Sequence, residues 1–86
     1  MNDYHIIFAR SARKELERLP AREVKRIITK ITALAMEPRP TGCRKLVSEQ
    51  NLWRIRVGEY RVVYSINDET QIVDIVTVRH LSEVYR

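Results

Sequence analysis

The sequence predicts an α+β domain with two N-terminal helices packed on one face of a mostly antiparallel four-stranded sheet, in the order β-α-α-β-β-β. Two patterns lead to this prediction. An apolar stripe with helical spacing occupies the first half of the chain, and strand-like segments separated by short turns occupy the second half. The 86 residues, 44% of them hydrophobic, suffice for one domain with a single modest core.

The first half is predicted to contain one strand and two helices. Residues 3–9 have the composition and length of a strand. Ser11 is the predicted N-cap of a short helix over residues 12–19. A second helix is expected over residues 22–37, where apolar side chains recur at i, i+3, i+4 and i+7. It must stop before Pro38, because proline disfavours a helical residue ahead of it.

The second half begins with a turn-rich segment and continues with three strands. Residues 37–46 are rich in proline, glycine and basic groups, which predicts a loop. Strands at about 52–57 and 60–67 form a hairpin, and a tight turn leads to a last strand at about 71–78. Residues 79–86 follow this strand as a tail.

A two-residue turn at Gly58-Glu59 predicts which hairpin residues face each other. One face is apolar and aromatic, with Val57 opposite Tyr60, Ile55 opposite Val62, and Trp53 opposite Tyr64. The other face collects three arginines around Val63, flanked by Leu52 and Ser65; they are Arg54, Arg56 and Arg61.

These three converging arginines need an explanation, because like charges directly opposite each other destabilise a sheet. Glu59 lies in the turn and can pair with at most one of them. The sequence therefore predicts that this face binds an anion. The alternative is that the arginines are solvated, or pair with a carboxylate elsewhere such as Asp74 on the last strand.

Charge and composition point in the same direction. The net charge is +5, the pI is about 9.8, and twelve arginines stand against four lysines. The planar fork of arginine suits phosphate recognition, so a polyanionic partner is expected, with nucleic acid ahead of an anionic membrane. A basic surface without a partner is the alternative.

The lone Cys43 rules out an intramolecular disulfide and fits a reducing compartment. No signal or membrane segment is recognisable, so a cytoplasmic protein is expected.

Several chemistries find no support in the sequence. It has no Cys/His cluster with zinc spacing, no paired carboxylates for magnesium and no glycine-rich phosphate loop, so no metal or cofactor is predicted. Serine–histidine–acid catalysis would need partners for Ser48, Ser65 or Ser82, and the spacing suggests none.

The C-terminal tail holds titratable and basic groups within eight residues, namely Arg79, His80, Tyr85 and Arg86. In an antiparallel sheet the end of the last strand lies near the start of the middle strand, which brings the tail towards Arg61.

Three segments, "PRPTGCRKL", "LWRIRVGEYRVVYSI" and "VTVRHLSEVYR", resemble the RelE/ParE superfamily of toxins from toxin–antitoxin systems. The resemblance covers essentially the whole chain, and the ending "VYR" points to the RelE branch. It implies a fold of two helices on an antiparallel sheet. It also implies an mRNA endonuclease that cleaves messages in the ribosomal A site without metal. The implied partners are the ribosome, mRNA and a cognate antitoxin that neutralises the toxin in a hetero-oligomer.

The resemblance also implies roles for individual residues. The implied catalytic set is Arg54, Arg56, Arg61, Arg79, His80 and Tyr85. The implied RNA-binding set is Arg44, Lys45, Arg54, Arg56, Arg61 and Arg86. Two departures stand out: relatives read Gly-His-Arg where this chain has Arg79, His80 and Leu81, and the archetype has lysines at positions 54 and 56.

The chemistry implied is in-line attack of a 2′-hydroxyl on the adjacent phosphate. Tyr85, with a pKa depressed by nearby cations, is the candidate base. The hairpin arginines stabilise the phosphate, and either His80 or Arg79 serves the leaving oxygen. Two alternatives remain: a ParE-like inhibitor of DNA gyrase, and a non-catalytic module that binds RNA or an antitoxin.

Overall fold

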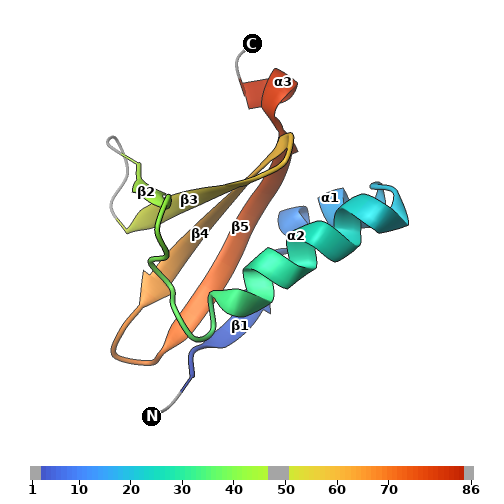
Figure 1. Cartoon of the computed structure of the whole chain (residues 1–86). Coiled ribbons are helices and arrows are strands. Elements are labelled where there is room, and N and C mark those ends of the chain that lie inside the picture. Colours follow the sequence, from blue (N-terminus) through green and yellow to red (C-terminus); the bar gives the residue numbers. More distant parts are fainter. Residues whose placement is uncertain (1–2, 47–50, 85–86) are drawn as a thin grey trace.

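The computed structural model describes residues 3–46 and 51–84, in which two helices cover one face of a mixed sheet (Figure 1). The elements in chain order are β1 (His5–Phe8), α1 (Arg10–Glu17), α2 (Ala21–Ala33), β2 (Arg44–Lys45), β3 (Leu52–Val57), β4 (Tyr60–Asn67), β5 (Ile72–His80) and α3 (Leu81–Val84). The five strands of this described part lie in the order β1-β5-β4-β3-β2. Antiparallel pairing joins β2 through β5, and β1 runs parallel to β5. The predicted α+β class is confirmed.

The sheet has one strand more than predicted. In β2, Arg44 pairs with Arg54 and Lys45 with Trp53, at the edge of the sheet. The prediction of a loop for these residues is wrong, because two residues cannot display the alternation that identifies a strand. The hairpin, in contrast, forms at the predicted positions, and β5 extends the last strand as far as His80.

Both helix predictions need correction at their ends. Ala9, not Ser11, is the N-cap of α1, and no side chain caps it. The hydroxyl of Ser11 instead donates a 2.8 Å hydrogen bond to the carbonyl of Val76 on β5, which ties α1 to the sheet. Helix α2 ends at Ala33, and the next residues form a turn in which the carbonyl of Ala35 accepts a 2.7 Å bond from the Tyr4 amide.

The core lies between the helices and the sheet. Its buried side chains come from α1, from one stripe of α2 and the residue after it, and from alternate strand positions: Ala12, Ile27, Ile31, Leu34, Ile55, Val57, Val62, Tyr64, Ile66, Val73, Ile75 and Val78. Burial of the apolar hairpin face fixes the register, since a slip by one residue would turn these side chains to the open face. The opposite face, free of α1 and α2, is therefore the one that carries the arginines.

The short helix α3 lies at the end of the sheet where β3 turns into β4 (Figure 1). The amide of Leu81 donates a 2.8 Å hydrogen bond to the carbonyl of Glu59 in that turn. The start of the tail thus reaches the hairpin end, as predicted. No helix within the described residues is long and apolar enough to span a membrane.

Candidate functional site

The hairpin register matches the predicted one and aligns arginines across four strands. Arg56 pairs with Arg61, and Arg61 pairs with Arg79 on β5. One row away, Arg54 pairs with Arg44 on β2. Because directly paired residues share a face of the sheet, all five arginines belong to the open face, two more than the hairpin alone supplies.

Four of these arginines line a pocket of about 280 Å³, which we call the arginine pocket. Its lining residues are Gly42, Arg44, Arg54, Ile55, Arg56, Arg61 and Leu81. They come from β2, β3, β4, the start of α3 and the segment before β2. Sequence reasoning found the arginines but missed Gly42, whose φ of +95° suits glycine in the turn that precedes β2. The Thr41-Gly42 turn signal was available, but nothing in it pointed to a binding site.

Carboxylates hardly neutralise the arginine pocket. Glu59 lies 3.9 Å from an Arg56 nitrogen, and both side chains are about two-thirds exposed, so water screens this pair strongly. Within residues 3–46 and 51–84, no carboxylate oxygen lies within 4.0 Å of a guanidinium nitrogen of Arg44, Arg54 or Arg61. The charge of the pocket is thus available to a bound anion.

The structure removes the alternative in which Asp74 neutralises the hairpin arginines. Asp74 pairs with Ser65 on β4, four residues from Arg61, which corresponds to roughly 13 Å along a strand. One of its carboxylate oxygens is buried with no hydrogen-bond partner among the described residues. Asp74 therefore lies on the open face but too far from the pocket to form an ion pair there.

The structure places His80 and Arg79, the two candidates for serving the leaving oxygen, on opposite faces of the sheet. His80 pairs with Tyr60, and the two rings meet edge to face with centroids 5.2 Å apart. Its Nδ1 accepts a 3.1 Å hydrogen bond from the amide of Ser82. Alternation along β5 therefore puts His80 on the helix face and Arg79 on the open face. Of the two candidate acids, only Arg79 shares a face with Arg61.

Lys45, a predicted RNA-binding residue, likewise points away from the arginine pocket. It pairs with Trp53, and its ammonium nitrogen lies 5.7 Å from the centroid of that ring. Only its neighbour Arg44 reaches the pocket. The predicted residues Tyr85 and Arg86 lie outside the described residues.

A second concave surface, which we call the helix groove, runs along α2 on the other side of β3. It consists of two adjoining pockets of about 350 and 400 Å³ that share Lys30 and Arg56. Its apolar lining comes from Ala33, Pro40 and the edges of the buried Leu34, Ile55 and Val57, and its charged lining from Lys25, Arg26, Lys30 and the acidic Glu37. Arg56 also lines the arginine pocket, so the two surfaces adjoin at this residue.

Comparison with known proteins identifies the family. The sequence pattern described as the ParE toxin of type II toxin–antitoxin system, parDE, matches residues 6–85. The chain belongs to this toxin family. It is 31% identical over 84 residues to toxin RelG of Mycobacterium tuberculosis, covering 96% of this chain and 97% of RelG.

Solved structures place this toxin beside RelE proteins. RelE from the archaeal RelE–RelB complex of Pyrococcus horikoshii superimposes with a TM-score of 0.81 at 27% identity, covering 92% of this chain and 96% of that one. The isolated E. coli RelE toxin gives a TM-score of 0.80 at 28% identity, covering 95% and 90%. The protein is thus a toxin of the RelE/ParE superfamily with a RelE-like fold, as the sequence resemblance implied.

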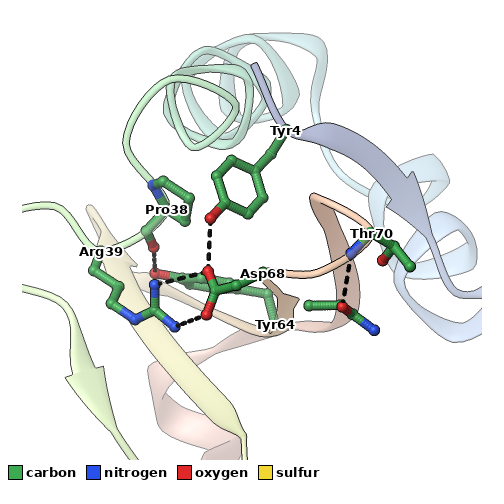
Figure 2. Close-up of polar contacts among 7 residues, drawn as sticks. Tyr4, Pro38, Arg39, Tyr64, Asp68 and Thr70 are labelled. Atoms are coloured by element: carbon green, nitrogen blue, oxygen red, sulfur yellow. Dashed lines mark hydrogen bonds and ion pairs between the residues drawn. The ribbon is translucent and has the colours of Figure 1, made fainter. Parts of the chain in front are cut away.

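At the opposite end of the sheet, the toxin contains a closed polar network (Figure 2). Asp68, in the β4–β5 turn, accepts hydrogen bonds from Arg39 at 3.0 and 3.3 Å and from the Tyr4 hydroxyl at 2.6 Å. The bond from Arg39, and then that from Tyr4, lower the pKa of the Asp68 carboxyl, and the bond to Asp68 raises the pKa of Tyr4. Nearby, the hydroxyl of the buried Tyr64 donates a 2.7 Å bond to the carbonyl of Pro38.

Metal-ligand groups do not gather in the described part of the toxin. Within residues 3–46 and 51–84, no three histidine, cysteine, aspartate or glutamate side chains lie close enough together to hold a metal ion. Cationic side chains supply the concentrated charge of the candidate site, and its chemistry is therefore that of anion binding.

Proposed function

We propose that this toxin is an endoribonuclease that cleaves mRNA in the ribosomal A site and so inhibits translation. One observation carries the proposal: the arginine pocket gathers four guanidinium groups on the open face, with almost no counter-charge from the described part of the chain. A phosphodiester supplies the missing negative charge, and arginine can donate two parallel hydrogen bonds to its oxygens. Messages and ribosomes are cytoplasmic, so we place the action of the toxin in the cytoplasm.

In the proposed reaction, the 2′-hydroxyl of the RNA attacks the adjacent phosphorus in line, and the P–O bond to the 5′-oxygen breaks. Arg54, Arg56 and Arg61 bind the phosphate and stabilise the extra negative charge of the pentacoordinate transition state. Tyr85 is the proposed general base, which accepts the proton of the 2′-hydroxyl. The leaving 5′-oxygen gains a proton from water held by Arg79, because a guanidinium with a pKa above about 12 keeps its own proton.

An action on DNA gyrase is the second candidate, because the matching family pattern is that of ParE. In that role the toxin would bind a protein and would need no catalytic tyrosine. Four arginines that converge in a concave pocket fit a single phosphate group better than a flat protein surface, so we rank RNA cleavage first.

The deciding experiment is brief induction of the toxin followed by mapping of RNA 3′ ends across the transcriptome. The RNA-cleavage proposal expects new 3′ ends within translated codons, in the reading frame of the ribosome. Intact messages together with a DNA-damage response would replace it with gyrase inhibition, and unimpaired growth would indicate a non-catalytic module. In vitro, we expect cleavage on purified ribosomes to persist when EDTA is added at a concentration that leaves the ribosomes intact.

We further propose that a cognate antitoxin neutralises the toxin by occupying the helix groove and reaching the arginine pocket. RelE relatives of this chain were solved as RelE–RelB and RelBE toxin–antitoxin complexes. The helix groove combines apolar lining around Ala33 and Pro40 with a border that is mostly basic, three cationic side chains against Glu37, which fits an amphipathic segment carrying carboxylates. Because Arg56 lines both surfaces, a segment bound in the groove can also cover the catalytic charge.

A further inference from the structure

The segment between α2 and β2 carries Arg39, whose guanidinium is held from two sides. Its two terminal nitrogens donate to the two carboxylate oxygens of Asp68 at 3.3 and 3.0 Å. Its central carbon lies 4.9 Å from the centroid of the Trp53 ring, a cation–π distance. Tyr4 completes the set through its 2.6 Å hydrogen bond to Asp68 (Figure 2). We call these four residues the Arg39 clamp.

The clamp holds the segment at Arg39, a few residues before the residues of the same segment that line the arginine pocket. Pro38, next to Arg39, is itself fixed by the 2.7 Å hydrogen bond from Tyr64, which is fully buried. Three residues after Arg39 comes Gly42, and five after it comes Arg44, and both line the pocket. The clamp lies at the β4–β5 end of the sheet. The segment that it holds in place runs from there to the arginine pocket, which lies towards the β3–β4 end.

The position of Arg44 depends on contacts outside its own strand, because that strand is very short. β2 has only two residues, whereas strands in globular proteins usually have about 3 to 10. The β2–β3 ladder therefore supplies few bonds to fix the direction of Arg44. The second residue of β2, Lys45, lies over the same Trp53 ring as Arg39. Trp53 thus couples the clamp directly to β2.

We propose that Arg39, clamped by Asp68 against Trp53, is a positioning residue that sets the place of Arg44 in the arginine pocket. The inference rests on the proposed function, because it takes the pocket to bind an RNA phosphate. Arg39 does not line that pocket, and its charge is neutralised by Asp68. It acts through the segment that it holds, and not by touching RNA.

The test is the affinity of the purified toxin for a single-stranded 2′-O-methyl RNA oligonucleotide, which cannot be cleaved, measured over a series of salt concentrations. The informative variant is Asp68→Ala. It raises the net positive charge by one, so general electrostatic attraction would strengthen RNA binding. Positioning predicts the opposite sign, namely affinity weakened by about tenfold or more if one charged hydrogen bond to the RNA is lost. The salt slope should fall by about 0.7 if one phosphate contact is lost.

Glu15→Ala is the matched control, since it removes the carboxylate of another surface ion pair, that of Glu15 on α1 with the C-cap residue Arg18 at 3.7 Å. It should leave RNA affinity unchanged or slightly higher. Asp68→Glu keeps a carboxylate and should restore most of the affinity. Trp53 is the sole tryptophan, so its fluorescence reports whether Arg39 has left the ring. If Asp68→Ala does not fold, Tyr4→Phe removes one of the three hydrogen bonds to Asp68 without changing any charge, and positioning predicts a smaller loss of RNA affinity in the same direction.

A double-mutant cycle separates positioning from general structural damage. If the clamp acts through Arg44, adding Asp68→Ala to Arg44→Ala should cause no further loss of affinity. Additive losses, or an Asp68→Ala variant that binds RNA as tightly as Glu15→Ala, would overturn the inference while leaving the proposed function intact. Wild-type toxin that binds RNA no better than a variant without Arg54, Arg56 and Arg61 would overturn both.

Discussion

The two ends of the sheet use the same guanidinium chemistry for opposite purposes. At the β4–β5 end, Arg39 is bonded to both oxygens of Asp68, and this pairing raises its pKa further. At the β3–β4 end, within residues 3–46 and 51–84, Arg56 alone among the pocket arginines has a carboxylate within 4.0 Å, that of the exposed Glu59. A neutralised arginine can only hold the fold together, whereas arginines left without partners remain free to bind. The pairing of charges, more than their number, therefore distinguishes the supporting end from the functional end.

The most direct test of this difference between the two ends is a triple variant in which alanine replaces Arg54, Arg56 and Arg61. RNA cleavage should become undetectable, because losing even one such electrostatic donor typically costs about 10²- to 10³-fold in rate. Ribosome-programmed cleavage of a defined message measures the effect. Alanine at Arg13, Lys14 and the C-cap residue Arg18 removes the same charge from exposed positions in and next to α1 and serves as the control. Equal loss of activity in both triple variants would mean that only net charge matters.

Removal of one hydroxyl group tests the acid–base chemistry proposed for RNA cleavage. Tyr85→Phe removes the hydroxyl of the proposed base and should reduce cleavage by at least about 10²-fold, the usual contribution of a general base. Deletion of Tyr85 and Arg86 should do the same, while the unfolding midpoint and antitoxin affinity stay near those of the wild type. Full toxicity of the phenylalanine variant in growing cells would remove Tyr85 from the mechanism.

Antitoxin binding should respond only partly to the unpaired charges. The variant lacking Arg54, Arg56 and Arg61 should bind the cognate antitoxin more weakly than the wild type, and with a shallower dependence on salt. Apolar contacts in the helix groove should preserve the complex. Calorimetry of both proteins across a salt series measures this. An affinity and a salt slope that match the wild type would show that the antitoxin avoids the arginine pocket.

The supporting end predicts a stability effect of moderate size. Tyr64→Phe removes the buried hydrogen bond to Pro38 and leaves that carbonyl without its partner, which should lower the free energy of unfolding by about 1–2 kcal/mol. Urea unfolding measures the difference. Tyr60→Phe is the control, since no hydrogen bond of the Tyr60 hydroxyl occurs within residues 3–46 and 51–84. Equal destabilisation by both substitutions would refute the role given to the Pro38 contact.

The smallest expected effect is the pH dependence of the Arg39 clamp. The folded-state pKa of Asp68 is lowered, first by Arg39 and then by Tyr4. The clamp therefore contributes stability above the unfolded carboxyl pKa of about 3.9, and this contribution disappears as the pH falls through the lower folded value. The stability difference between wild type and Asp68→Asn should thus shrink below about pH 4 in urea unfolding. A difference that stays constant from neutral pH to pH 2.5 would contradict the ion pair.

Most of the functional end could be predicted from local sequence. The turn at Gly58-Glu59 and the alternation of the hairpin strands determine which residues pair, so Arg54, Arg56 and Arg61 were placed on one face correctly. The same alternation at the end of β5 puts Arg79 and His80 on opposite faces, whereas the resemblance to relatives implies a catalytic role for both. Alternation carries information only where a strand is long enough to show it.

The supporting end could not be predicted, for a physical reason. Tyr4, Arg39 and Asp68 come from three segments whose contacts depend on how the finished fold brings them together. No spacing in the sequence links residues 29 or 64 positions apart. The strand β2 was missed for a similar reason, since two residues form a strand only because β3 is already there to pair with them.

The strand β2 also affects how copies of the toxin meet one another. It lies at an edge of the sheet, and sheet edges expose backbone groups that can pair with a second chain and begin aggregation. Here the edge strand is only two residues long, and both residues, Arg44 and Lys45, are cationic and exposed. Two copies approaching edge to edge would bring these cations together and repel each other. The arginine proposed to bind RNA therefore also helps to keep the sheet from extending into a second molecule.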